Sequence, residues 1–304
     1  MSSNTHARRR PGRRAAMAAG LVLAVGLGAS TQATAQAAAP AKTSAKASTA
    51  LRSVSGFNGE VVTQVADFYG AYIDAKGDPK GPDAALAGAL RAHYLAPAFA
   101  ARLKTWEKKN KVDGVLRAQN VPVDWTVSEG ATGLEAVVTL AFGGGESPTT
   151  TTRFVVEQEA TGDIINIRTT NSTPVKASAS VRSVSGRTGD PVTRVADFYG
   201  AYVDAKGDPK GPDAALAGAL RAHYLAPAFA KRLKAWEKKN KVDGVLRAQN
   251  VPVDWTVSES RNGRDIVVTH NFGGGEAPTV RTDLVVELEP VFGDVTDIRA
   301  TSAR

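Results

Sequence analysis

The chain has no cysteine among its 304 residues. This absence excludes disulfide bonds, and it also excludes lipid attachment through an N-terminal cysteine. Any folded part must therefore be stabilised by its own hydrophobic core. A segment of about 120 residues is long enough to bury such a core without covalent cross-links.

Histidine is also scarce. After the N-terminal segment the chain has only His93, His223 and His270, and none of them has another histidine at the spacing of metal ligands. No serine–histidine–aspartate arrangement can be proposed from the spacing either. We therefore expect no metal site and no cofactor.

Long apolar runs are missing except near the N-terminus. The stretch from Ala15 to Ala29 is 15 residues long, which suits the apolar region of a signal peptide but is short for a membrane span. Arginines precede it, and Ala33-Thr34-Ala35 and Ala35-Gln36-Ala37 are both small-x-small cleavage sites. We expect a signal peptide over 1–37, an uncleaved anchor being the alternative, and a secreted product without a membrane span.

A strong charge imbalance is absent once this segment is removed. The whole chain carries +8, and loss of the five arginines of the signal lowers that charge to about +3. The lysines between Lys104 and Lys111 are best interpreted as a solvated helix face, with a cell-surface polyanion as the alternative partner. Nucleic acid is not expected, because no stacking aromatics accompany these lysines.

The chain does contain a long internal repeat. Residues 65–129 and 195–259 align at an offset of 130, and only three of the 65 aligned positions differ. A repeat of this length indicates a duplicated domain. Alanine-, lysine- and serine-rich stretches flank the repeats and cannot bury enough surface to fold. We expect a flexible leader over 38–51, repeat one over 52–169, a linker over 170–181 and repeat two over 182–304.

Hydrophobic periodicity changes within each repeat. Val62, Val65, Tyr69 and Tyr72 recur at spacings of three and four, which predicts a helix with one buried face. Trp125 alternates with polar neighbours, which predicts a strand with a buried indole. In repeat one the pattern predicts helices over 60–75, 82–94 and 97–111, then strands over 123–127, 134–142, 149–158 and 164–169. This order predicts an α+β fold with a curved four-stranded antiparallel sheet around three helices.

Two motifs resemble a family of bacterial exported domains of unknown function. These are Phe68-Tyr69-x-x-Tyr72 and the run from Asp113 to Trp125, which recurs from Asp243 to Trp255. That family is similar in turn to the NTF2-like α+β cone fold. The resemblance implies two tandem NTF2-like cone domains and export, but it implies no reaction.

Cone-shaped folds of this type enclose a pocket between the helices and the sheet. By analogy of fold, relatives use it for isomerases, dehydratases or plain ligand binding. The polar groups that we expect there are Asp67, Tyr69, Tyr72, His93, Tyr94 and Gln119, with the repeat-two partners Asp197, Tyr199, Tyr202, His223, Tyr224 and Gln249. Structural packing of these side chains is the competing interpretation.

The sequence favours a non-enzymatic protein that binds a small molecule or a cell-surface component. The alternative is an isomerase- or dehydratase-like enzyme that acts on a small apolar molecule. It would use His93 and His223 for acid–base chemistry, with Tyr69 and Tyr199 as hydrogen-bond donors. The repeats could act as a tethered bivalent pair, or their sheets could pack on each other as an intramolecular pseudo-dimer.

The sheet halves of the repeats have diverged. Between 130–157 and 260–287, 13 of 28 positions differ, and Leu140 is replaced by His270. If this position faces the core, His270 is a buried polar group that needs a partner. If the strand has the other register, the position is exposed. Alternation in the sequence does not decide between the two, and we favour the exposed position.

Overall fold

The computed structural model describes residues 51–143, 150–170, 182–260, 265–273 and 280–301. The expected signal peptide, nearly all of the leader and nearly all of the linker lie outside the described residues. Residues Thr49–Arg304 form one compact unit. Within the described ranges, no helix combines the length and the apolar character that crossing a bilayer requires.

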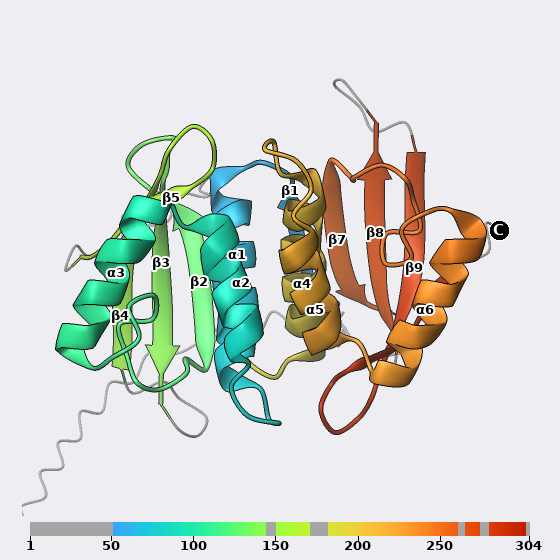
Figure 1. Ribbon diagram of the computed structural model, residues 1–304, viewed down its shortest axis with the longest axis horizontal. Coiled ribbons are helices and arrows are strands. Elements are labelled where there is room, and N and C mark those ends of the chain that lie inside the picture. The colour runs from blue at the N-terminus through green and yellow to red at the C-terminus, as the bar shows by residue number, and fades with distance from the viewer. Residues whose placement is uncertain (1–50, 144–149, 171–181, 261–264, 274–279, 302–304) are drawn as a thin grey trace, which may run out of the picture. The chain divides into compact units, whose positions relative to one another are not determined.

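The elements follow the same order in both repeats (Figure 1). Repeat one contains β1 (Ser53–Phe57), α1 (Val61–Gly77), α2 (Ala84–Tyr94), α3 (Pro97–Asn110), β2 (Asp124–Glu129), β3 (Glu135–Phe142), β4 (Thr150–Gln158) and β5 (Ile164–Thr169). Repeat two contains β6 (Ser183–Arg187), α4 (Pro191–Gly207), α5 (Ala214–Tyr224), α6 (Pro227–Asn240), β7 (Asp254–Glu259), β8 (Ile266–Phe272), β9 (Val280–Leu288) and β10 (Val295–Ala300). The fold is α+β, and the three helices and four strands that periodicity predicts in repeat one are present.

The helices form for local reasons. Asp83 caps α2, because its carboxylate accepts a hydrogen bond from the Leu86 amide at 2.9 Å. Pro97 opens α3, where its missing N–H costs nothing. Helix α3 buries only Phe99 and Leu103, so its lysine-rich side is exposed to solvent as expected. Helix α1 is buried around most of its circumference, because it lies between its own sheet and α4.

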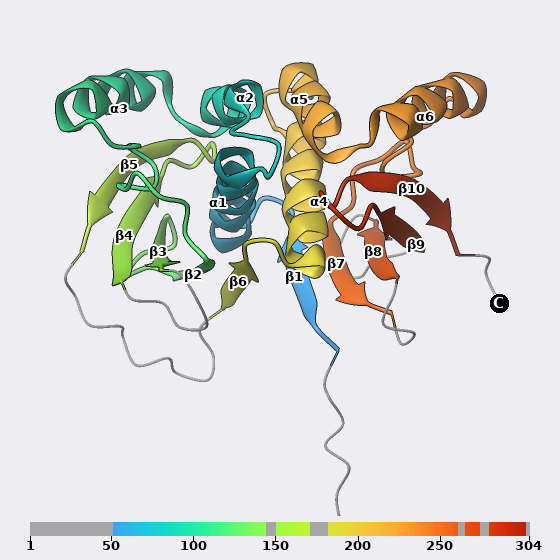
Figure 2. The ribbon, with the colours of Figure 1, turned by 90° about the horizontal axis from the view of Figure 1, so that it is seen from below.

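Each repeat contributes to a five-stranded antiparallel sheet (Figure 2). The strand orders are β5-β4-β3-β2-β6 and β1-β7-β8-β9-β10. The expectation of four-stranded sheets is therefore wrong. Strands β1 and β6 are not evident from the sequence, since each is only five residues long and contains a glycine.

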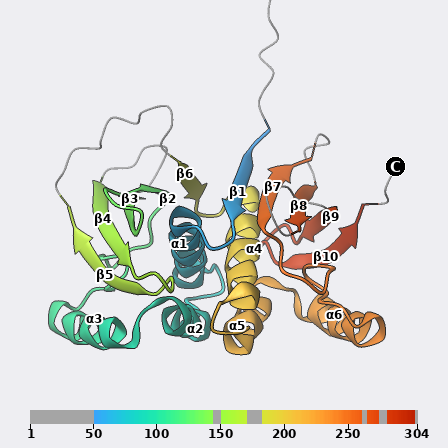
Figure 3. The same ribbon diagram turned by 90° about the horizontal axis from the view of Figure 1, so that it is seen from above.

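The fifth strand of each sheet comes from the other repeat. Strand β1 pairs with β7, and β6 pairs with β2, in the same register in both sheets. Gly56 lies opposite Trp255, and a Cβ added at Gly56 would lie 2.7 Å from the indole. Glycine is therefore required where the indole crosses the strand. In Figure 3, β1 and β6, each the edge strand of its sheet, lie next to each other.

Helices also join the repeats. Helix α1 packs on α4, and α2 packs on α5. The contact is close because Gly70 and Gly200 lack side chains, and each lies against an aspartate of the opposite helix. The alternative in which the two sheets pack on each other is therefore not the arrangement found, since helices join the repeats. The two repeats are related as the halves of an isologous dimer that shares strands.

Strand alternation settles which face is buried. In β3 the buried residues are Ala136, Val138, Leu140 and Phe142, and they face the helices. Trp125 on the neighbouring strand is only 3% exposed, which confirms that its indole belongs to the core.

Candidate functional site

The end of α2 reaches across to the other repeat. Tyr94 is buried, and its hydroxyl donates a hydrogen bond to Oδ2 of Asp204 at 2.7 Å. The second repeat returns the same contact, from Tyr224 to Asp74 at 2.8 Å. Burial, partly offset by the hydrogen bond from Tyr94, raises the pKa of Asp204 to about 7. These tyrosines therefore connect the repeats through carboxyl groups in the core.

The neighbouring histidines make a parallel set of contacts. Nδ1 of His93 lies 3.1 Å from Oδ2 of Asp213, and Nδ1 of His223 lies 3.0 Å from Oδ2 of Asp83. Because Asp83 and Asp213 also cap α2 and α5, each carboxylate links a helix start to the histidine of the other repeat. Burial and the nearby charge of Arg194 lower the pKa of His223.

The other candidate tyrosines donate hydrogen bonds to acceptors within their own repeat. The hydroxyl of Tyr69 donates to the carbonyl of Val115 at 3.4 Å, and that of Tyr72 donates to Asp113 at 2.7 Å. Tyr199 and Tyr202 do the same in repeat two, with Val245 and Asp243 as acceptors. Burial raises the pKa of all four phenols, so they stay protonated at neutral pH.

Gln119 and Gln249 lie on the surface. The amide of Gln119 donates to the carbonyl of Lys111 at 3.4 Å, and its side chain lines a shallow surface groove together with Tyr72. His93 and Tyr94 instead line a cavity at the junction of the repeats. The structure therefore divides the expected pocket residues between separate places.

Asp67 and Asp197 occupy the contact between α1 and α4. Asp67 lies against Gly200, and Asp197 lies against Gly70. Burial raises the pKa of both carboxyls well above the usual range, and the charges of neighbouring aspartates add to the effect. They therefore belong to the interior of the helix contact.

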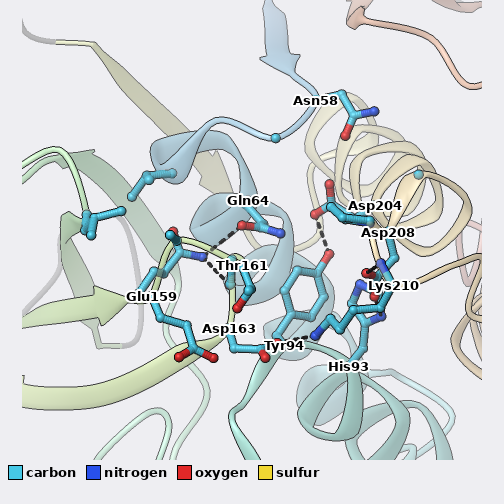
Figure 4. Close-up of a pocket in the computed structure, with 18 residues that line it drawn as sticks. Asn58, Gln64, His93, Tyr94, Glu159, Thr161, Asp163, Asp204, Asp208 and Lys210 are labelled. Atoms are coloured by element: carbon cyan, nitrogen blue, oxygen red, sulfur yellow. Dashed lines mark hydrogen bonds and ion pairs between the residues drawn. The ribbon is translucent and has the colours of Figure 1, made fainter.

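The junction cavity of repeat one has a volume of about 210 Å³ (Figure 4). Gln64, His93 and Tyr94 line it from repeat one, and Asp204 and Lys210 line it from repeat two. The side-chain oxygen of Gln64 accepts a hydrogen bond from Gln158 at 2.9 Å. This bond joins two polar side chains of the wall, and Oε1 of Gln158 has no hydrogen-bond partner among the described residues.

The corresponding cavity of repeat two is larger, at about 350 Å³. Arg194 stands where repeat one has Gln64, and Leu288 stands where repeat one has Gln158. Neither residue was proposed from the sequence. Position 64 lies one residue before the near-identical segment, so a comparison extended by one residue would have found the change.

His270 is fully buried, at 0% exposure, as is Leu140 in the other repeat. The interpretation that this position is exposed is therefore wrong, because β3 and β8 turn this face toward the helices. Neither ring nitrogen of His270 has a hydrogen-bond partner among the described residues, and the ring packs beside Tyr199. Burial lowers the pKa of His270 to about 4, although the nearby backbone of Leu246 opposes the shift.

The described ranges contain no group of three or more histidine, cysteine, aspartate or glutamate residues placed to hold a metal ion. Comparison with protein-family models and with curated proteins finds no match. Among solved structures, a candidate lipoprotein from Clostridium difficile 630 aligns at 9% identity, over 68% of this chain and 95% of that chain. Its TM-score of 0.16 is too low to support an argument about fold or function.

Proposed function

We propose that this chain is an exported, non-catalytic binding protein in which the two repeats act as one body. The observation that carries the proposal is the use of the candidate catalytic groups. His93 and His223 pair with Asp213 and Asp83 across the junction, while Tyr69 and Tyr199 donate to backbone carbonyls. The histidines hold the repeats together and the tyrosines are satisfied within their own repeat, which leaves the junction cavities as places where a small molecule can bind.

An isomerase- or dehydratase-like activity is the competing proposal. It would need an imidazole within hydrogen-bond reach of a substrate, beside a phenol that donates. His93 does line a cavity beside Tyr94, but the hydroxyl of Tyr94 is already committed to Asp204. We therefore favour binding without turnover.

We also infer that each repeat is NTF2-like. Three helices followed by antiparallel strands support this inference, as does the packing of α1 against β2 and β3. In this interpretation β1 and β6 are additions that join two cone domains at their edges.

A screen on the mature chain tests the proposed function. Small molecules and cell-surface fragments would be added to residues 38–304, and the melting temperature Tm would be measured. We expect at least one compound to raise Tm in proportion to its concentration, since a ligand of the folded state stabilises it. Proton NMR of the same mixture should show the compound unchanged.

Two results would contradict the proposal. One is conversion of the compound that is abolished in His93→Ala or His223→Ala while the fold is retained, because these imidazoles would then be catalytic. The other is a panel in which no compound changes Tm.

A further inference from the structure

The two junction cavities occupy equivalent places but have diverged in chemistry. Gln64 and Gln158 hydrogen-bond to each other in the smaller cavity of repeat one. Their counterparts, Arg194 and Leu288, cannot do so. Repeat two therefore combines a buried charge with a cavity of about 350 Å³.

Arg194 is incompletely paired. Arg194 is only 8% exposed, and its Nη2 has no hydrogen-bond partner among the described residues. The nearest carboxylate oxygens lie 3.6 Å from Nη1, on Asp74, and 3.9 Å from Nη2, on Asp294. Both distances exceed hydrogen-bond length, and a buried donor without an acceptor is costly.

Glu259 supplies the opposite charge on the wall of the same cavity. Its carboxylate makes no hydrogen bond or ion pair with any residue that the structure describes, and it forms no salt bridge with Arg194. Glu129, at the matching position of repeat one, does not line the smaller cavity. Arg194 and Glu259 thus line the same cavity with opposite charges and form no ion pair with each other.

The remaining wall is largely apolar. Ile266, Leu288 and Phe292 line it, and Phe292 belongs to the turn that is one residue longer in repeat two. Asp74, Asp265 and Glu289 also line the cavity, so the acidic groups outnumber Arg194 and disfavour a plain anion. A ligand that carries a positive group as well as a negative one matches both kinds of charge on this wall.

We propose that this cavity binds a small zwitterion with an apolar body, of the class of neutral α-amino acids. Its carboxylate accepts hydrogen bonds from Arg194, its ammonium group donates to Glu259, and its side chain packs on Ile266, Leu288 and Phe292. This assignment rests on the proposed binding function and names the ligand class for one of its two cavities.

Isothermal titration calorimetry of the mature chain with L-leucine tests the assignment. The two comparison ligands are 4-methylpentanoate, which lacks the ammonium group, and 3-methylbutylamine, which lacks the carboxylate. We expect saturable binding of L-leucine at one site and affinities lower by about tenfold or more for both analogues, since each loses a charged hydrogen bond.

Three variants locate the site. Arg194→Gln introduces the residue that repeat one has at this position, and Glu259→Gln removes the second charge; each should weaken L-leucine binding by about tenfold or more. Glu129→Gln is the matched control and should bind as the unaltered chain does. Circular dichroism checks that Arg194→Gln is folded. If Arg194→Gln is unfolded, the binding affinity of Glu259→Gln tests the assignment instead.

Equal binding of leucine and its analogues would overturn the zwitterion assignment, and so would unchanged binding in Glu259→Gln. Absence of leucine binding, while other compounds still raise Tm, would overturn the assignment and leave the proposed function standing. Absence of binding by every compound would overturn both.

Discussion

A single buried imidazole distinguishes the cores of the two repeats. His270 and Leu140 occupy equivalent positions, both fully buried and both opposite a tryptophan of the neighbouring strand. Burial lowers the pKa of His270 to about 4, below the 6.5 of a free imidazole. The folded chain therefore resists protonation at this site.

Acid should destabilise the protein through His270. As pH falls below 6.5, the unfolded chain binds a proton that the folded chain does not, so this residue's contribution is complete at neutral pH and is lost by about pH 4. The loss corresponds to about 3 kcal/mol. His270→Leu should lessen this decline of the unfolding free energy between pH 7 and pH 4, as measured by urea denaturation at each pH.

The reverse exchange is the control. Leu140→His places an imidazole in the equivalent site of repeat one and should steepen the acid loss. Equal pH profiles for His270→Leu and the unaltered chain would show that the imidazole is accessible to protons in the folded state.

At the scale of elements, the exchanged strands set the arrangement of the repeats. The turns at Gly59 and Gly189, both with φ of +80°, lead from β1 into α1 and from β6 into α4. Arg52, just before β1, pairs with Asp190 at the start of α4, and Arg182 pairs with Glu60 at the start of α1. Exchange therefore ties each strand to the helix of the other repeat.

Engineered cysteines should detect the exchange, because the chain has none of its own. Ser55 lies opposite Thr256 in the pairing of β1 with β7, at a separation typical of a disulfide. Oxidation of Ser55→Cys with Thr256→Cys should yield an intramolecular cross-link, visible as loss of free thiol and a mobility shift under non-reducing conditions.

The matched control pairs Ser55→Cys with Thr126→Cys. Thr126 occupies the same place in β2, where it lies opposite Ser185 instead. This pair should keep its free thiols, whereas Ser185→Cys with Thr126→Cys should cross-link. Efficient bonding of the Ser55 and Thr126 cysteines would mean that β1 returns to its own sheet.

At the scale of the whole molecule, the two repeats are joined by exchanged strands, by packing of α1 on α4 and by tyrosine–aspartate hydrogen bonds. Loss of packing in one repeat should therefore be felt in the other. Trp125 is a suitable probe, because its indole packs in the sheet of repeat one against β6 of repeat two.

Trp125→Ala should lower the free energy of unfolding by about 3–5 kcal/mol, since it leaves a large cavity in the core. Hydrogen exchange in β7 and β8 of repeat two should accelerate together with that in β2 and β3, because the unit unfolds cooperatively. Faster hydrogen exchange confined to repeat one would contradict this expectation.

Much of this architecture is local and can be read from the residues. Helical spacing at Val62, Val65 and Tyr69 predicts α1, alternation around Trp125 predicts β2, and Asp83 marks the start of α2. Each pattern depends only on which side chains of one helix or strand face the core. It can therefore be recognised in any stretch of sequence that contains the whole helix or strand. The α+β class follows from their order.

The sequence by itself also determined that the helical half of the repeat occurs twice, because 62 of 65 aligned positions are identical. It could not decide which copy of a strand pairs with which sheet. Strands β1 and β6 share Ser-Val-Ser-Gly, and their partners β2 and β7 are identical, so pairing within a repeat and between repeats would have the same register. Only the tertiary structure removed that ambiguity, because strand pairing depends on contacts between residues far apart along the chain: β1 pairs with β7 and β6 pairs with β2. Contacts between the repeats also place His93 beside Asp213, and they place Arg194 in the wall of its cavity. The sequence does not reveal these neighbours, because they lie far apart along the chain.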